Sequence, residues 1–254
     1  MKTKLFILIA ISFGLFALNS KNTEENFTPP GTVKIGTNIF MDATEITNMN
    51  WREYMYWNER IYGKTSEQYI ATIPDTNVWT KEYKTLYLTH PAYGEYPVVG
   101  ISWKQAVVFC NWRSDRVMEH LLIKKEMNPK MIIPKKLEYR LPTIEEWENI
   151  AGAGYEEKTQ HKLDKKYADS PKANFKSEKQ DITVNTTAPV HQYWPNKLGT
   201  YNMLGNVAEM TNEEGVAKGG SWVQLESEVS IDKDFEYKNP ENWIGFRCLC
   251  EVEY

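Results

Sequence analysis

The sequence contains few of the residues that hold catalytic metals. Among its 254 residues there are only three cysteines and four histidines. The cysteines are Cys110, Cys248 and Cys250, and the histidines are His90, His120, His161 and His191. No two histidines stand three or four residues apart, the spacing that places two side chains on one face of a helix. A histidine-rich iron site is therefore not expected.

The chain also lacks an excess of positive charge, since its formal net charge at pH 7 is -4. It offers no broad basic surface to a phosphate backbone, so nucleic acid is not an expected partner. Disorder is not expected either, because 41% hydrophobic and 25% charged residues are ordinary for a globular domain. Aromatic residues reach 13%, which predicts a core built from wide, flat side chains.

Long apolar runs are absent except near the start of the chain. One charge-free run extends from Leu5 to Leu18, directly after Lys2 and Lys4. This run is shorter than the roughly 20 residues that a bilayer span needs, and its length is typical of a secretory signal. We therefore expect export to the periplasm or the cell surface, with no transmembrane span left after cleavage.

The composition divides the chain into three parts. We expect residues 1–20 to be a signal peptide and residues 21–31, which are polar and include Pro29 and Pro30, to be a flexible arm. Residues 32–254 then form one domain that is large enough to bury a core without disulfides. No cysteine lies near the predicted cleavage site, so a lipid anchor is not expected.

Capping residues mark the first of three predicted helices. Thr47 precedes Trp51, Tyr54, Met55 and Ile61, which share roughly one helical face. This pattern predicts an amphipathic helix that begins after a threonine cap. Its aromatic side chains are expected to serve core packing rather than ligand binding.

Two further helix starts carry a capping box, in which two side chains satisfy each other's backbone amides. Ser102 with Gln105 marks one start, and Thr143 with Glu146 marks the other. Gly152 predicts where the last helix ends.

Strands are predicted toward both ends of the domain. Residues 33–41 alternate loosely and predict one strand, and the C-terminal GFRCLCEVEY segment predicts another. We expect residues 63–95 to be loop with short strands, and residues 153–187 to be a long surface segment. Together these elements predict an α+β fold.

Five segments follow one another in a fixed order along the domain. They are MDATEITN (41–48), YPVVGISWKQAVVFCNW (96–112), YRLPTIEEWENIAG (139–152), APVHQYWPNKLGTYNMLGNVAEM with VAKGGSW (188–222), and GFRC (245–248). In this order they resemble the sulfatase-modifying-factor family, which includes the formylglycine-generating enzymes. The resemblance implies a C-type-lectin-like α+β fold with two packed helices, small irregular antiparallel sheets and much loop.

The resemblance also implies a disulfide. In relatives, the cysteines at the positions of Cys110 and Cys248 are bridged, so we expect the same pair here. Cys250 is then left as a free thiol.

Structural roles follow for the two helices with capping boxes. In the family, the helix that begins after Thr143 packs beside the one that begins after Ser102. Its acidic residues and a preceding arginine anchor neighbouring loops. We therefore expect Arg140, Glu145 and Glu146 to form structural ion pairs rather than to act in catalysis.

The copper site of the family is not preserved in this sequence. Formylglycine-generating enzymes hold Cu(I) on two cysteine thiolates, which are soft ligands for a soft ion. The corresponding positions after the GGS turn are Gln224 and, a few residues later, Val229. In the family pattern GN-x-W-E-W, Ala208 and Met210 replace the tryptophans, whereas Glu209 is kept. We therefore expect no copper and no catalytic residue.

Three residues of this turn are expected to face a substrate or a partner, namely Ser221, Trp222 and Gln224. Ser221 has no histidine or acid identifiable as an activating partner, so a nucleophilic role is not expected. We expect its side chain to hold the glycine turn by a hydrogen bond.

Relatives also carry structural calcium on asparagine and aspartate side chains and backbone carbonyls, the hard oxygen ligands that this ion prefers. One possible site consists of Asn174, Phe175, Asp181 and Thr183, and a second of Asn206 and Glu209. In the alternative interpretation, Asn174 and Asn206 only stabilise turns.

These patterns leave three functional hypotheses. The first is a non-catalytic exported module that binds a protein or glycan of the bacterial cell envelope. Its MDATEITN segment resembles that of degenerate relatives in the gliding and type IX secretion apparatus. The second is an oxygen-dependent modifying enzyme with a rebuilt centre that uses Cys250. The third is a calcium-dependent glycan-binding module.

Overall fold

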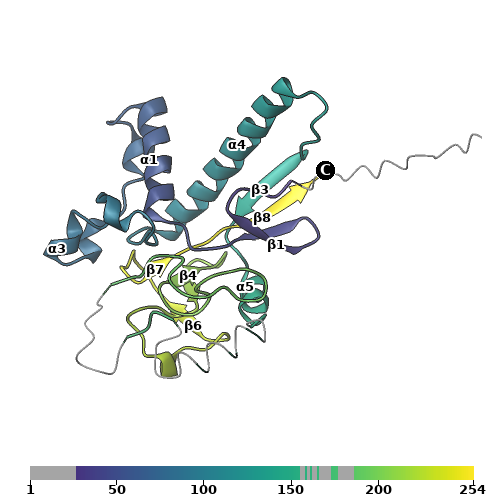
Figure 1. Ribbon diagram of the computed structural model, residues 1–254. Coiled ribbons are helices and arrows are strands. Elements are labelled where there is room, and N and C mark those ends of the chain that lie inside the picture. The colour runs from purple at the N-terminus through teal and green to yellow at the C-terminus, as the bar shows by residue number, and fades with distance from the viewer. Residues whose placement is uncertain (1–26, 155–157, 159–160, 162–164, 166–172, 177–185) are drawn as a thin grey trace, which may run out of the picture.

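The computed structural model describes residues 27–154, 158, 161, 165, 173–176 and 186–254. Its helices are α1 (Asn48–Tyr62), α2 (Glu67–Ile70), η1 (Thr76–Val78), α3 (Lys81–Lys84), η2 (Pro91–Tyr93), α4 (Trp103–Met127), α5 (Ile144–Ala151) and η3 (Glu226–Glu228). Its strands are β1 (Thr32–Gly36), β2 (Ile39–Asp42), β3 (Lys136–Arg140), β4 (Ala208–Met210), β5 (Val216–Lys218), β6 (Asp234–Glu236), β7 (Ile244–Gly245) and β8 (Leu249–Glu253). The predicted α+β fold with much loop is confirmed (Figure 1).

The upper half of the molecule consists of a four-stranded sheet with α1 and α4 beside it (Figure 1). The strand order is β1-β2-β8-β3, and every neighbouring pair is antiparallel. Trp51 of α1 stacks on Phe109 of α4 with ring centroids 5.3 Å apart, and Phe246 meets Phe109 edge-on at 5.4 Å. The aromatic residues therefore fill the main core, as the composition predicts.

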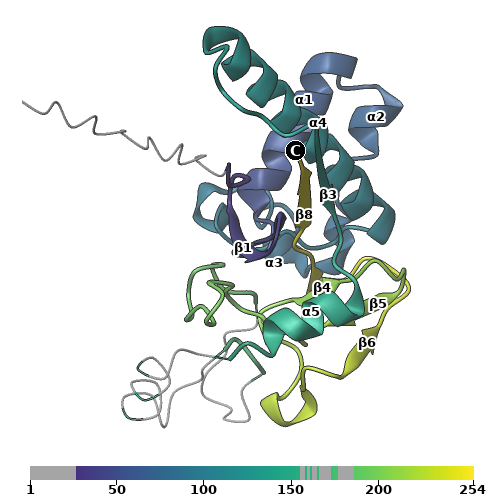
Figure 2. The ribbon, with the colours of Figure 1, turned by 90° about the vertical axis from the view of Figure 1, so that its right-hand side faces the viewer.

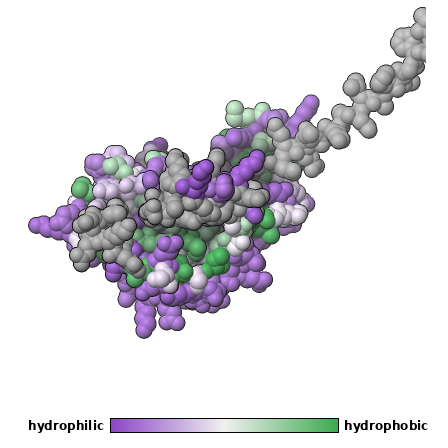
Figure 3. Space-filling model, turned by 60° about the horizontal axis from the view of Figure 1, so that its bottom comes forward, coloured by the Kyte–Doolittle hydropathy of each residue, from purple (hydrophilic) through white to green (hydrophobic). Residues whose placement is uncertain are grey.

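The lower half contains the second sheet and α5 (Figures 1 and 2). Its order is β6-β5-β4-β7, with antiparallel pairs except for the parallel pair β4–β7. Trp147 of α5 is fully buried and packs with Met41 and Met203. The face in Figure 3 is mostly hydrophilic where its residues are coloured, and its apolar side chains gather only in small groups.

The three predicted helix starts are confirmed. Thr47, Ser102 and Thr143 are the N-caps of α1, α4 and α5, and each takes part in a capping box. Trp51 and Tyr54 are buried as expected, but Ile61 is 55% exposed, so the apolar face of α1 ends before that turn. The predicted end of α5 at Gly152 is also confirmed.

Other predictions were wrong in their local structure. Residues 33–41 form two strands rather than one, because the chain reverses near Asn38, whose φ is 60°. Residues 63–95 contain short helices and no strand. The α5 helix lies against the second sheet, away from α4, rather than beside that helix (Figures 1 and 2). Its buried Trp147 and Ile150 face a separate apolar cluster.

The described part of the predicted arm contacts the domain. Phe27 packs against the main core, and the backbone oxygen of Pro30 accepts a hydrogen bond from Arg113 at 2.9 Å. The predicted signal peptide lies outside the described residues. Within the described ranges, no helix is both long and apolar enough to cross a bilayer.

Candidate functional site

The glycine turn of residues 219–224 connects β5 to η3 and lies against α5. Gly219 and Gly220 have φ angles of 89° and 64°, which favour glycine. A Cβ atom on Gly219 would lie 2.6 Å from the backbone oxygen of Met203 and 2.9 Å from the Trp147 ring. Trp222 also donates its backbone N–H to Asn206 at 3.0 Å. The turn is therefore fixed by close backbone contacts that no larger residue allows.

At the first family copper position, Gln224 forms a hydrogen bond within the turn. The Ser221 hydroxyl donates to Gln224 Oε1 at 2.6 Å and accepts from the backbone N–H of Val223 at 3.3 Å. Ser221 therefore makes the turn-holding contacts expected of it. Ser221 is fully buried in this structure, whereas Trp222 and Gln224 keep some exposed surface, and the expectation that these residues face a partner stays a prediction.

At the second family copper position, Val229 packs on the same turn. A Cβ atom built on Gly220 would lie 2.4 Å from Val229 Cγ2, and Val229 joins the apolar cluster of Ala208, Ala217 and Phe235. Gln224 and Val229 thus lie against the adjacent residues Ser221 and Gly220. The two positions that the sequence analysis assigned to the family's copper ligands therefore carry an amide and an aliphatic side chain.

The Trp222 side chain belongs to an aromatic cluster next to this turn. Its ring stacks on Trp79 with centroids 6.2 Å apart and planes 13° from parallel. Its indole N–H donates to the backbone oxygen of Asn242 at 3.1 Å. Tyr87 extends the cluster, with its ring 4.5 Å from Trp79. These contacts orient Trp222 as part of the scaffold.

The retained Glu209 lies in a buried ion pair beneath the turn. Arg247 Nε donates to Glu209 Oε2 at 2.7 Å, and Trp147 Nε1 donates to the same oxygen at 2.8 Å. Arg247 Nη2 donates to the other carboxylate oxygen at 2.5 Å. Burial, the largest single influence, works to lower the pKa of Arg247, but the charge and hydrogen bonds of Glu209 together with the charges of Glu45 and Asp42 raise it, so the guanidinium stays charged. Calcium on Glu209 would have to displace these donors.

Asn206, the other residue of that predicted calcium site, is hydrogen-bonded at both ends of its amide. Its Oδ1 accepts from Ala188 N at 2.7 Å and from Asn174 Nδ2 at 3.2 Å. Its Nδ2 donates to Glu45 Oε1 at 2.8 Å. These contacts favour the alternative in which Asn174 and Asn206 stabilise turns. Phe175 is partly buried, and Asp181 and Thr183 lie outside the described residues, so the first calcium site stays a prediction.

The structure adds Glu45 and Asn202, which the sequence analysis did not select. Glu45 is only 1% exposed, and Asn202 Nδ2 lies 3.2 Å from each of its carboxylate oxygens. Burial raises the pKa of Glu45 to about 7, although the charge of Arg247 opposes this. Asn202 Oδ1 is buried and has no hydrogen-bond partner among the described residues. The sequence signal that could have pointed to Glu45 was that it is the one acidic residue between the end of β2 and the start of α1.

The three cysteines lie in the main core and away from the glycine turn. The Sγ atoms of Cys110 and Cys248 are 3.4 Å apart, whereas a disulfide bond measures about 2.05 Å. The structure brings this pair together, and the bond itself stays a prediction. Cys250 is buried, and burial raises the pKa of its thiol to about 12. In the part of the chain described, no three His, Cys, Asp or Glu residues form a metal-holding group.

Replacing Gln224 with alanine removes the acceptor of the Ser221 hydroxyl. We expect Gln224→Ala to lower the free energy of unfolding by about 1–2 kcal/mol, because a buried hydroxyl loses its partner. Urea denaturation followed by tryptophan fluorescence measures this loss. Ser227→Ala, at an exposed position of η3, serves as the matched control and should change the free energy little. Equal effects of the two substitutions would show that the hydrogen bond does not hold the turn.

Nearly the whole chain matches one known protein family. Residues 2–252 match the family described as "Sulfatase-modifying factor enzyme 1-like domain". Two solved structures have the same fold, namely CarF and Treponema denticola variable protein 1, each with a TM-score of 0.52. CarF is 21% identical, with 88% of this chain and 96% of that chain covered. The variable protein is 18% identical, with 88% and 92% covered.

Curated relatives differ in what their names state. Serine/threonine-protein kinase Pkn1 of Chlamydia trachomatis is 23% identical, over 97% of this chain and 38% of its own. The formylglycine-generating enzyme of Mus musculus is 24% identical, over 81% and 58%. The inactive C-alpha-formylglycine-generating enzyme 2 of Bos taurus is 28% identical, over 61% and 50%. The chain thus matches between 38% and 58% of the length of these relatives.

Proposed function

The chain belongs to the sulfatase-modifying factor enzyme 1-like domain family, and from this premise we propose that it is a non-catalytic member that acts as an exported binding or assembly module of the bacterial cell envelope. The observation that carries the proposal is the content of the glycine turn. Ser221, Gln224 and Val229 fill it with a hydrogen bond and an aliphatic contact. Neither an amide nor an aliphatic side chain is a suitable ligand for Cu(I).

The scaffold around that turn supports a binding role. Arg247 and Glu209 hold the segments below it together, and the aromatic cluster at Trp222 holds its side. A fold alone does not certify an activity, and the family match includes relatives named as active and as inactive. A scaffold that keeps its packing while its glycine turn lacks copper ligands supports a binding role rather than an oxidase role.

Export and the envelope location rest on the N-terminal pattern of Lys2, Lys4 and the apolar run from Leu5 to Leu18. An association with gliding or type IX secretion rests only on the resemblance of MDATEITN. Cell fractionation with N-terminal sequencing tests the location. We expect the mature protein in the envelope or medium, starting near residue 20. Cytoplasmic protein that keeps its first residues would contradict export.

Activity is tested directly with a peptide thiol. The purified protein is incubated with Cu(I), oxygen and a cysteine-containing peptide, and the peptide is followed by mass spectrometry. We expect unchanged thiol, while a formylglycine-generating enzyme run in parallel forms its aldehyde product. Aldehyde formation by this protein would favour the second hypothesis, an oxygen-dependent enzyme with a rebuilt centre. Loss of that activity in Cys250→Ser would identify the thiol that it uses.

Structural calcium is proposed at Glu45 and Asn202 rather than at Glu209. A hard cation here would satisfy the unpartnered Asn202 Oδ1 and compensate the Glu45 charge. It requires the Asn202 amide to turn its oxygen toward Glu45 and the Nδ2 donors of Asn202 and Asn206 to leave the carboxylate. Calcium supplies charge here and takes part in no reaction.

Thermal unfolding with added calcium or chelator tests this site. At a hundredfold excess over its Kd, calcium should stabilise the protein by about 2.7 kcal/mol. We expect Glu45→Gln to abolish that gain, and the control Glu59→Gln, on α1, to retain it. A gain that survives in Glu45→Gln would place the ion elsewhere, for example at Asn174 and its predicted neighbours. Glycan arrays read with and without chelator test the third hypothesis, which requires binding that depends on calcium.

A further inference from the structure

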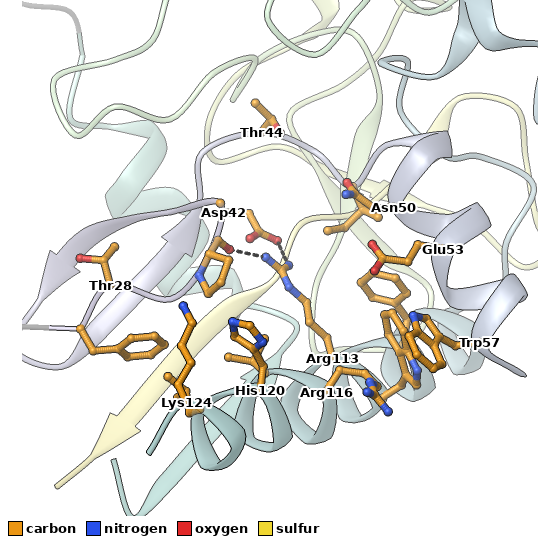
Figure 4. Close-up of a pocket in the computed structure, with 18 of the residues that line it drawn as sticks. Thr28, Asp42, Thr44, Asn50, Glu53, Trp57, Arg113, Arg116, His120 and Lys124 are labelled. Carbon is orange, nitrogen blue, oxygen red and sulfur yellow. Dashed lines mark hydrogen bonds and ion pairs between the residues drawn. The ribbon is translucent and has the colours of Figure 1, made fainter. Parts of the chain in front are cut away.

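A groove of about 690 Å³ runs between α1, α4 and the loop of residues 27–31 (Figure 4). Its α1 wall includes Asn50, Glu53 and Trp57, and its α4 wall includes Arg113, Arg116, His120 and Lys124. None of its lining residues belongs to the glycine turn of residues 219–224. The groove is therefore a second candidate site, distinct from the altered copper position.

The charges in this groove differ from one end to the other. His120 and Lys124 stand four residues apart on one face of α4 and have no ion-pair or hydrogen-bond partner among the described residues. Glu53 lies toward the opposite end, where the Arg116 guanidinium sits 4.4 Å from the Trp57 ring centroid (Figure 4). Arg113 is neutralised by Asp42, 2.7 Å away. An acidic group is therefore favoured near Lys124, whereas a polyanion would be repelled at Glu53.

Two buried polar atoms along the groove have no partner in the described structure. They are Asp42 Oδ1, an acceptor on a residue that is 3% exposed, and Trp112 Nε1, a donor. More than about nine in ten buried polar groups in proteins are hydrogen-bonded, so such atoms need an explanation. Both atoms expose almost no surface, so a bound peptide, which carries both N–H and C=O groups, satisfies either of them only where the side chains over it move aside.

The remaining lining is mixed. Ile46, Val117, Leu121 and Met131 form its aliphatic part, and Phe27, Phe109 and Trp112 contribute aromatic rings. A leucine-like side chain fits the aliphatic part of this lining. From these features we propose that the groove binds an extended peptide segment of a partner protein. The segment places an acidic residue at His120 and Lys124 and an apolar side chain against the aliphatic lining.

This inference rests on the proposed binding role but concerns a surface separate from the glycine turn, and Glu45, the residue of the proposed calcium site, also lines it. Copper binding or thiol oxidation at the glycine turn would overturn the non-catalytic proposal and leave the groove untouched. Conversely, a groove without peptide affinity would leave the altered copper position as described.

The test begins with a random heptapeptide library displayed on phage and panned against the purified full-length protein. We expect enrichment of peptides in which an acidic residue and a leucine-like residue stand close together. The most enriched peptide is then labelled and its Kd measured by fluorescence anisotropy. No enrichment, or enrichment of basic peptides, would overturn the proposal. Binding of uronic-acid oligosaccharides without any peptide binding would overturn it in favour of a glycan.

Variants of α4 identify the site of binding. The double variant His120→Ala/Lys124→Ala should raise the Kd of the labelled peptide at least tenfold. Lys104→Ala, on the opposite side of the same helix, should leave the Kd unchanged. Lys124→Glu should regain affinity for a peptide whose acidic residue is replaced by lysine. Trp112→Phe should weaken binding, because it removes the donor that the peptide satisfies. Equal affinities in all these variants would contradict the assignment.

Discussion

Replacing Arg247 with methionine is expected to lower the free energy of unfolding by about 3–5 kcal/mol, because it leaves a buried charge without its partner. Arg247 and Glu209 are 0% and no more than 1% exposed at their side chains. Besides Glu209, Arg247 donates to the backbone oxygens of Tyr201 at 2.6 Å and Asp42 at 3.2 Å. Its loss therefore loosens three segments at once. Urea denaturation followed by circular dichroism measures the change.

Arg140→Met is the matched control for this prediction. Arg140 pairs with Glu146 and Glu251, but its side chain is 30% exposed, so its replacement should cost only about 1 kcal/mol. The double variant Arg247→Met/Glu209→Leu should recover part of the loss, since it removes the uncompensated charge. If Arg247→Met cost no more than Arg140→Met, the buried pair would not be what holds the scaffold.

The second large effect is a gain of copper binding. We expect the double variant Gln224→Cys/Val229→Cys to bind one Cu(I) per chain, because both side chains lie against the adjacent residues Gly220 and Ser221. Two thiolates at those positions supply the soft ligands that Cu(I) prefers. Competition with a Cu(I) chelator under reducing, anaerobic conditions measures the affinity.

Each single variant serves as a control for the copper gain. Gln224→Cys or Val229→Cys alone offers one thiolate and should bind far more weakly than the pair. A double variant that binds no better than the single variants would mean that the two positions do not converge. The backbone of this turn would then not bring positions 224 and 229 close enough to share one ion, although the sequence motifs of the family remain.

Much of the fold could be predicted because its signals are local. The capping boxes at Ser102 and Thr143 lie within four residues, and both helices begin there. The short helices of residues 63–95 were missed because elements such as α2 and α3 span four residues each, too few to establish a helical period. The reversal at Asn38 was missed because residues 33–41 alternate as a single strand would, although asparagine adopts positive φ more readily than other non-glycine residues.

The site was predictable only where a motif fixed the position. The GGS turn located Gln224 and Val229, and the structure places both against it. The partners of Glu45 could not be predicted, because Asn202 and Asn206 lie 157 and 161 residues further along the chain. Arg140 and Glu146 pair as expected, whereas Glu145 is exposed and forms no ion pair with any described residue, so its role stays a prediction.

The central claim is that the glycine turn of this protein does not bind Cu(I). It is tested most directly by titrating the wild-type protein with Cu(I) against a competing chelator under the same reducing, anaerobic conditions, with the Gln224→Cys/Val229→Cys variant beside it. We expect the chelator to retain all the copper in the presence of the wild type. One tightly held Cu(I) per wild-type chain would contradict the claim.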